Sequence, residues 1–151
     1  MSPSHRWLLA LILCPTALIA QQKPRVACLD TAMTQGAMTI CAGEGYKAKA
    51  AQLNALLAQL RDTLSPSQRT LLDSAQGAWA QYSVVQCRLE NDDSHDGSAY
   101  PMLVALCRSA LTTQRIKELA PLLCALTDML DEPCPPAQKY LTTPDSTNAG
   151  P

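Results

Sequence analysis

Apolar residues recur along the middle of the chain at steps of three and four, the spacing of one face of an α-helix. The first such stripe is Tyr46, Ala50, Leu53, Leu57, Leu60 and Leu64. Gly43 and Gly45 lie just upstream and predict a kink or a break in this helix. No segment alternates apolar and polar residues as a half-buried strand does, and no internal repeat is present. The pattern therefore predicts an all-α fold.

A helix-start signal separates the first stripe from a second. Ser65 suits an N-cap, Pro66 suits the first helical position, and Gln68 completes a capping-box pattern. The second stripe follows at the same spacing, and Leu72 and Trp79 widen it: Leu71, Ala75, Ala78, Tyr82, Val85 and Leu89. We expect this stripe to face the core, with the Trp79 ring filling the centre of the bundle.

The second half of the chain contains one loop, one further long helix and a tail. Residues 90–100 are polar and acidic and include an Asp-Gly-Ser turn, which predicts a loop. A third helix is expected from about Pro101 to Leu119, and Pro121 either kinks it or opens a short fourth segment. Residues 131–151 are rich in proline and polar residues, a composition that predicts a flexible tail.

The connections between the predicted helices are short, so consecutive helices are expected to run antiparallel. The sequence therefore predicts a small disulfide-stapled antiparallel helical bundle over residues 21–130. It would contain three main helices plus a short C-terminal helical segment. About 100 ordered residues make only a modest core, so covalent staples are expected to contribute to its stability.

The first twenty residues have the three-part layout of a secretory signal peptide. A short positive start at residues 5–6 precedes an apolar run that ends at Ile19, and Ala20 offers a small residue for cleavage. The run is interrupted by Pro15 and is shorter than the roughly 20 apolar residues of a membrane span. We therefore expect cleavage near Ala20, a periplasmic or secreted mature protein, and no stable membrane insertion after cleavage.

Cysteine usage agrees with export. Cys124 and Cys134 bracket a short turn and are expected to pair with each other. No two cysteines of the mature chain are closer than ten positions, and His95 is its only histidine, so the spacing does not favour a metal site. An even set of cysteines in a small exported chain predicts a disulfide framework, here of six: Cys28, Cys41, Cys87, Cys107, Cys124 and Cys134.

Two pairings are open for the first four of these cysteines. Residues equidistant from a turn lie at the same level of an antiparallel helix pair, so Cys41 and Cys87 are expected to face each other across the turn near Leu64. Cys28 would then pair with Cys107, which lies nearly level with Cys87. The alternative pairs Cys28 with Cys87 and Cys41 with Cys107.

The distribution of charge excludes one class of partner and suggests another. Of the twelve basic residues, Arg6 belongs to the expected signal peptide, so the mature chain has eleven basic and thirteen acidic residues. It contains no basic patch that would bind nucleic acid. Exposed carboxylates concentrated in one loop would steer a cationic protein toward it. The candidate partner-binding residues are therefore Glu90, Asp92, Asp93 and Asp96.

The same loop contains residues that could be mistaken for a catalytic or calcium site. Ser94, His95 and Asp96 are adjacent, but a catalytic triad is defined by geometry and not by adjacency. Leu103 stands where a calcium loop would place its closing acidic ligand. We therefore expect a protein that is not an enzyme and that uses no cofactor and no metal ion.

Four ordered pieces of the chain resemble the lysozyme-inhibitor LprI-like N-terminal domain family of small exported bacterial proteins. The opening piece is similar to the family's T-Q-x-x-M-x-x-C, and a Leu-Asn pair follows. The third resembles its A-Q-x-A-W-x-x-Y…C signature, and the last its G-S…C…L-T-x-x-R-x-x-E-L ending. These pieces are Thr34–Cys41, Leu53-Asn54, Ala75–Cys87 and Gly97–Leu119.

The resemblance implies a helical, disulfide-bonded fold and, for some members, inhibition of lysozyme. We expect structural roles for its motif residues Gln76, Trp79, Tyr82 and Arg115, with Gln76 in an interhelix hydrogen bond. This chain departs from the family at Ser83-Val84, where Arg-Asp is common. We interpret the protein as an exported envelope binding protein whose partner is a lysozyme or another cationic cell-wall protein. The alternative is a structural or accessory envelope module without inhibitory activity.

Overall fold

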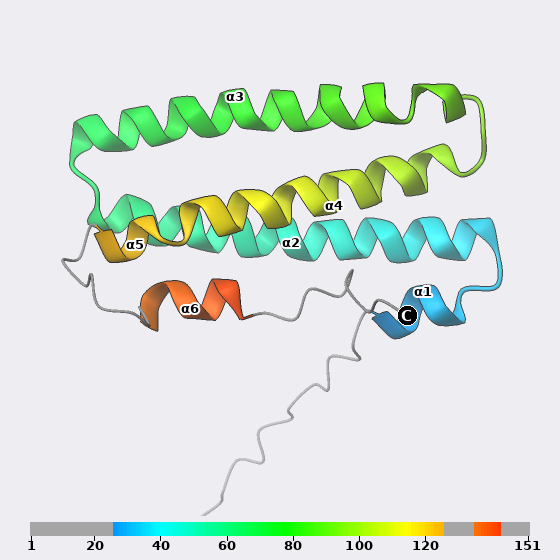
Figure 1. Ribbon diagram of the computed structural model, residues 1–151, viewed down its shortest axis with the longest axis horizontal. Coiled ribbons are helices and arrows are strands. Elements are labelled where there is room, and N and C mark those ends of the chain that lie inside the picture. Colours follow the sequence, from blue (N-terminus) through cyan, green and yellow to red (C-terminus); the bar gives the residue numbers. More distant parts are fainter. Residues whose placement is uncertain (1–25, 126–134, 143–151) are drawn as a thin grey trace, which may run out of the picture.

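A computed structural model describes residues 26–125 and 135–142, and within these ranges the regular structure is helical, with no strand. In chain order the elements are α1 (Val26–Thr31), α2 (Gln35–Thr63), α3 (Pro66–Glu90), the short 3-10 helix η1 (Asp92–Ser94), α4 (Tyr100–Leu119), α5 (Leu122–Ala125) and α6 (Pro135–Leu141). The three long helices α2, α3 and α4 lie side by side (Figure 1), which confirms the predicted all-α bundle. The expected signal peptide and its cleavage site lie outside the described residues.

Helix α2 is continuous over its whole length. It begins after Thr34, whose Oγ1 accepts a hydrogen bond from the backbone N–H of Ala37 at 3.1 Å. The helix then runs to Thr63, so the interruption predicted at Gly43 and Gly45 is wrong. Each glycine costs about 1 kcal/mol of helix propensity, and the packing of α2 against α4 offsets that cost.

Replacing Gly45 with alanine is expected to raise the free energy of unfolding by about 0.5–1 kcal/mol. No heavy atom lies within 4 Å of the position that the new Cβ would occupy, so the gain in helix propensity meets no steric cost. Chemical denaturation of the parent and the variant measures the change. A loss of stability would contradict a helix that is continuous at Gly45.

Local sequence signals place the start of α3 and the extent of α4 correctly. Pro66 occupies the first turn of α3, and Gln68 Oε1 accepts a hydrogen bond from the Ser65 backbone N–H at 3.0 Å. The third long helix ends at Leu119 as expected, and α5 is the short segment predicted after Pro121. The turn chemistry of the chain is therefore a good guide to where its helices begin and end.

The apolar core lies at one end of the bundle, beside the turn between α2 and α3. Its members come from the last part of α2, the start of α3, the end of α4 and the short helices α5 and α6. At the opposite end the helices carry few fully buried apolar side chains. The core residues are Leu53, Leu56, Leu57, Leu60, Leu72, Ile116, Leu119, Ala120, Leu123, Cys124, Ala137 and Tyr140.

Helix α6 corrects the expectation of a flexible tail from residue 131 onward. Ala137 and Tyr140 are buried in the core, and the Tyr140 hydroxyl donates to Gln59 Oε1 on α2 at 3.1 Å. Helix α6 is thus attached to the bundle by two buried side chains and one side-chain hydrogen bond. The prediction is wrong for residues 135–142, and the remainder of the expected tail lies outside the described residues.

Helix α3 buries a different face from the one predicted. The stripe that includes Leu71, Val85 and Leu89 is exposed, at 70%, 65% and 70% respectively. The face toward α4 lies about a third of a turn away, since successive residues are about 100° apart around a helix. It is less apolar, which explains the error, and consists of Leu72, Gln76, Trp79, Ser83 and Cys87.

The Trp79 ring is at the edge of the core and not at its centre. Its side chain is only partly buried and packs against the core cluster from outside. The position follows from the orientation of α3, because the helix lies on the outer side of α4 (Figure 1). The expectation that Trp79 fills the bundle is therefore wrong.

Both pairings considered for the first four cysteines are wrong. Cys28 is bonded to Cys41, with Cα atoms 5.7 Å apart, and Cys87 is bonded to Cys107, with Cα atoms 5.6 Å apart. The predicted levels of the cysteines were sound, but α4 and not α3 packs along α2, so Cys87 faces Cys107. The short helix α1 folds back on the start of α2 and brings Cys28 to Cys41.

Cys124 is also disulfide-bonded. Its partner is not one of the four cysteines above, because those are bonded to each other. The predicted partner, Cys134, lies outside the described residues.

Candidate partner-binding surface

Three of the four family-motif residues meet where α3 crosses α4. The guanidinium of Arg115 donates through Nε to Gln76 Oε1 at 3.4 Å and lies 5.9 Å from the centroid of the Trp79 ring. Its Nη1 is 3.2 Å from Glu118 Oε2, one turn along α4. This confirms the predicted interhelix hydrogen bond of Gln76 and adds an ion pair of Arg115 with Glu118. The group ties α3 to α4 and is structural in character.

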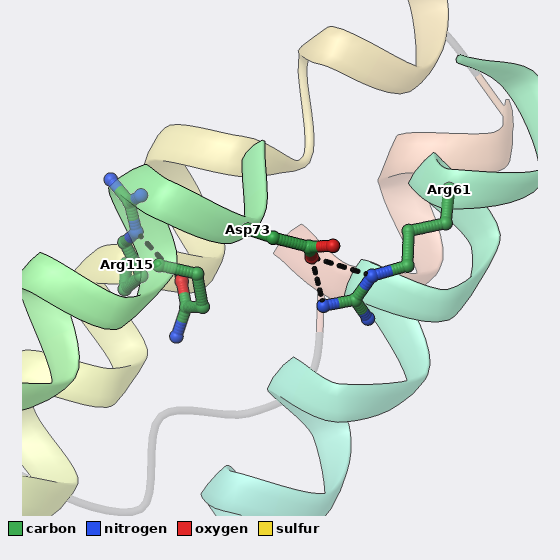
Figure 2. Close-up of polar contacts among 4 residues, drawn as sticks. Arg61, Asp73 and Arg115 are labelled. Carbon is green, nitrogen blue, oxygen red and sulfur yellow. Dashed lines mark hydrogen bonds and ion pairs between the residues drawn. The ribbon is translucent and has the colours of Figure 1, made fainter. Parts of the chain in front are cut away.

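A second polar contact ties α3 to α2. Arg61, near the end of α2, donates through Nε and Nη2 to Asp73 Oδ1 at 2.8 and 2.6 Å (Figure 2). Both side chains are about half exposed, so the ion pair contributes little beyond about 1 kcal/mol. It links the end of α2 to the start of α3 across the turn.

Tyr82 separates from the rest of the family motif. Its side chain is 52% exposed and lies on the outer stripe of α3, whereas Trp79, one turn earlier, faces α4. The structure thus brings Gln76, Trp79 and Arg115 together and leaves Tyr82 at the surface.

The four acidic residues predicted to face a partner lie at the α3–α4 connection, at the end of the bundle away from the core. Glu90 is the last residue of α3, Asp92 and Asp93 begin η1, and Asp96 follows it; all four are exposed. Glu90 Oε1 accepts a hydrogen bond from Gln86 Nε2 at 2.8 Å. The loop therefore presents its carboxylates to solvent on a short, hydrogen-bonded turn.

The loop histidine is held by its neighbours. Its Nδ1 lies 2.8 Å from the backbone oxygen of Asp92, and its Nε2 lies 3.1 Å from Asp96 Oδ2. Both ring nitrogens of His95 are thus engaged within the loop, which leaves neither for the Ser94 hydroxyl. The arrangement is that of a structured turn.

Other features of the described residues give no stronger candidate site. A cavity of about 140 Å³ lies among α2, α4 and α6, lined in part by Lys49, Ile116 and Tyr140, and is well below the usual size of a ligand pocket. Within residues 26–125 and 135–142, no group of three or more histidine, cysteine, aspartate or glutamate side chains is placed to hold a metal ion. No helix in these ranges is long and apolar enough to cross a membrane.

The outer stripe of α3 is the surface feature that the sequence interpretation missed. Its regular spacing and its apolar residues predict a core face. A second apolar line on the same helix could have indicated that the stripe is exposed. This second line consists of Leu72, Trp79 and Cys87. A helix with two such lines has a surplus face once one of them is buried.

Comparison with known proteins gives one family and one relative. A family model described as lysozyme inhibitor LprI matches residues 28–119. A curated, uncharacterized protein of Rhizobium meliloti (strain 1021) is 33% identical over 128 residues, which cover 76% of this chain and 91% of that protein. No solved structure matches the chain.

Proposed function

The chain belongs to the lysozyme inhibitor LprI family, and from this membership we propose that it is an exported envelope protein that binds and inhibits a lysozyme. The observation that carries the proposal is the family match, which spans α2, α3 and α4 and both observed disulfides. The proposal assigns binding and not catalysis. A structural or accessory role in the envelope is the competing function.

The acidic loop supports a cationic partner. Glu90, Asp92, Asp93 and Asp96 place four exposed carboxylates within seven positions at one end of the molecule. Lysozymes are usually basic, so a concentrated negative field would attract them and orient the encounter. The Cys87–Cys107 disulfide holds both helices that carry the loop, which limits the ordering cost of binding.

A muramidase assay with the purified, oxidised mature protein tests the proposal. The assay should include several lysozyme types and a range of salt concentrations. We expect dose-dependent inhibition of at least one basic lysozyme, and stronger inhibition at low salt. Absence of inhibition and of binding across the whole set would favour the accessory role.

Neutralising Glu90, Asp92, Asp93 and Asp96 together, to glutamine and asparagine, is expected to slow association with a basic lysozyme at least about tenfold at low salt. The cause is loss of charge steering, which acts over a screening length of only about 8 Å at physiological ionic strength. The difference should shrink as salt is added. Because the four side chains are exposed, the unfolding midpoint should stay close to that of the parent.

The matched control compares two triple variants with the same change in net charge. One replaces Asp92, Asp93 and Asp96, and the other neutralises acidic residues outside the loop, namely Asp30, Glu44 and Asp62, which are also exposed. Association rates measured by surface plasmon resonance should fall more in the loop variant. Equal rates in both variants would place the binding surface elsewhere on the molecule.

A further inference from the structure

The outer stripe of α3 is an apolar helix face that nothing in the described part of the chain covers. Its large side chains are between 52% and 70% exposed, and its two alanines are exposed as well. Helix α3 packs on α4 through a different face, about a third of a turn away. The stripe consists of Leu71, Ala75, Ala78, Tyr82, Val85 and Leu89.

The spacing of this stripe is that of a helix–helix seam. Its steps are four, three, four, three and four, which is the strict 3.5-residue repeat of the a and d positions in a coiled coil. A stripe that only faces a globular surface is wider and follows the 3.6-residue period. The partner that fits this face is therefore another α-helix.

The stripe is also symmetric about Ala80. Leu71 and Leu89 lie nine residues to either side, Ala75 and Val85 lie five, and Ala78 and Tyr82 lie two. Two copies of α3 that run antiparallel across a two-fold axis at this level would place each residue opposite its symmetric counterpart. Leucine would then pack on leucine, and each alanine would face the larger valine or tyrosine, as interdigitating seams require.

Side-chain size decides between the two directions of such a pair. In a parallel, in-register pair Ala75 and Ala78 would each face their own kind and leave gaps, whereas Tyr82 would face Tyr82. The charged residues of α3 do not decide it, because Arg69 and Asp73 lie about 160° around the helix from the stripe and Asp73 is paired with Arg61 of α2.

We propose that the protein forms a homodimer through an antiparallel α3–α3 seam, with its two-fold axis level with Ala80. The seam leaves the α2–α4 core untouched and covers the exposed stripe of both copies. Helix α3 has 25 residues, a length of about 37 Å, so the dimer carries one acidic loop near each end of the seam. The dimer does not depend on lysozyme inhibition and would form in its absence.

Sedimentation analysis of the oxidised mature protein, from about 1 µM to about 1 mM, tests the dimer. We expect a monomer–dimer equilibrium with no larger species, because an antiparallel pair closes on itself. Ala78→Glu places a carboxylate in the seam of both copies and should raise the dissociation constant at least about tenfold. Ala80→Glu is the matched control, since Ala80 is exposed on the opposite side of the same helix, and should leave the constant unchanged.

A compensating charge tests the orientation. In the antiparallel dimer Ala78 lies opposite Tyr82 of the second copy, so Tyr82→Lys added to Ala78→Glu brings opposite charges face to face and should recover part of the lost affinity. In a parallel dimer each new charge would face its own kind, and the double variant would bind no better than Ala78→Glu alone. A monomer at every concentration would overturn the proposal and leave the stripe for a different protein. A dimer that tolerates Ala78→Glu would overturn the seam, and a double variant that recovers no affinity would overturn its direction.

Discussion

Replacing Cys87 and Cys107 together with alanine is expected to lower the free energy of unfolding by about 3 kcal/mol or more. The disulfide closes a loop of 20 residues, for which the chain-entropy model gives about 3 kcal/mol. Packing adds to this, because the Cys87 side chain is fully buried. Beyond Trp79, the buried side chains of α3 are Ser83 and Cys87 alone. The disulfide is therefore the main attachment of this half of the helix.

Hydrogen exchange distinguishes the loss of a local attachment from a general loss of stability. Amides of the second half of α3 should exchange faster than those of α2 and α4 in this variant. The matched control removes Cys28 and Cys41, whose disulfide closes a loop of similar length, with a sequence separation of 13. Its effect on exchange should be confined to α1 and the start of α2. Unchanged protection of α3 after removal of Cys87–Cys107 would contradict the assigned role.

The features that the sequence predicted correctly are set by neighbouring residues. The start of α3 depends on Ser65, Pro66 and Gln68, which lie within four positions. The buried stripe of α2 is set by spacing within one helix, and its predicted members Leu53, Leu57 and Leu60 are buried. Such signals need no knowledge of which helix lies beside which, and they are confirmed.

The prediction of the disulfide pairing is wrong because it required knowledge of which helices are neighbours. Distances from a turn give the level of a residue along the bundle, and Cys41, Cys87 and Cys107 do lie toward the same end. Hairpin geometry alone does not say that α4 packs along α2 while α3 contacts α4 more sparsely. The choice of neighbour is made by the core between α2 and α4, whose side chains are far apart in the sequence.

The candidate site was predictable to a similar degree. The interhelix hydrogen bond of Gln76 is predicted from helical spacing and is confirmed, but its partner Arg115 and the place of Tyr82 at the surface required the structure. The acidic loop was recognised from composition, because four acidic residues in seven positions cannot be buried. Its binding role stays a prediction. The distinction between the two faces of α3 required the structure, because both faces satisfy a helical period.

Adjacent leucines on α3 give a direct test of which face is buried. Leu72→Ala is expected to lower the free energy of unfolding by about 2–5 kcal/mol, as for other buried leucines, because Leu72 is 9% exposed and belongs to the core cluster. Leu71→Ala should cost less than about 0.5 kcal/mol, since its side chain is 70% exposed. Chemical denaturation of both variants at about 1 µM protein, a concentration chosen to favour the monomer, provides the comparison.

The same pair of variants separates folding from association. If Leu71 lies in a seam between two copies, Leu71→Ala becomes destabilising only as the protein concentration rises, because binding between folded copies adds to the apparent stability. Leu72→Ala should destabilise the protein to the same extent at every concentration, since Leu72 packs within one copy. A large cost for Leu71→Ala in the dilute monomer would mean that the outer stripe packs inward. Both the observed orientation of α3 and the antiparallel seam would then be wrong.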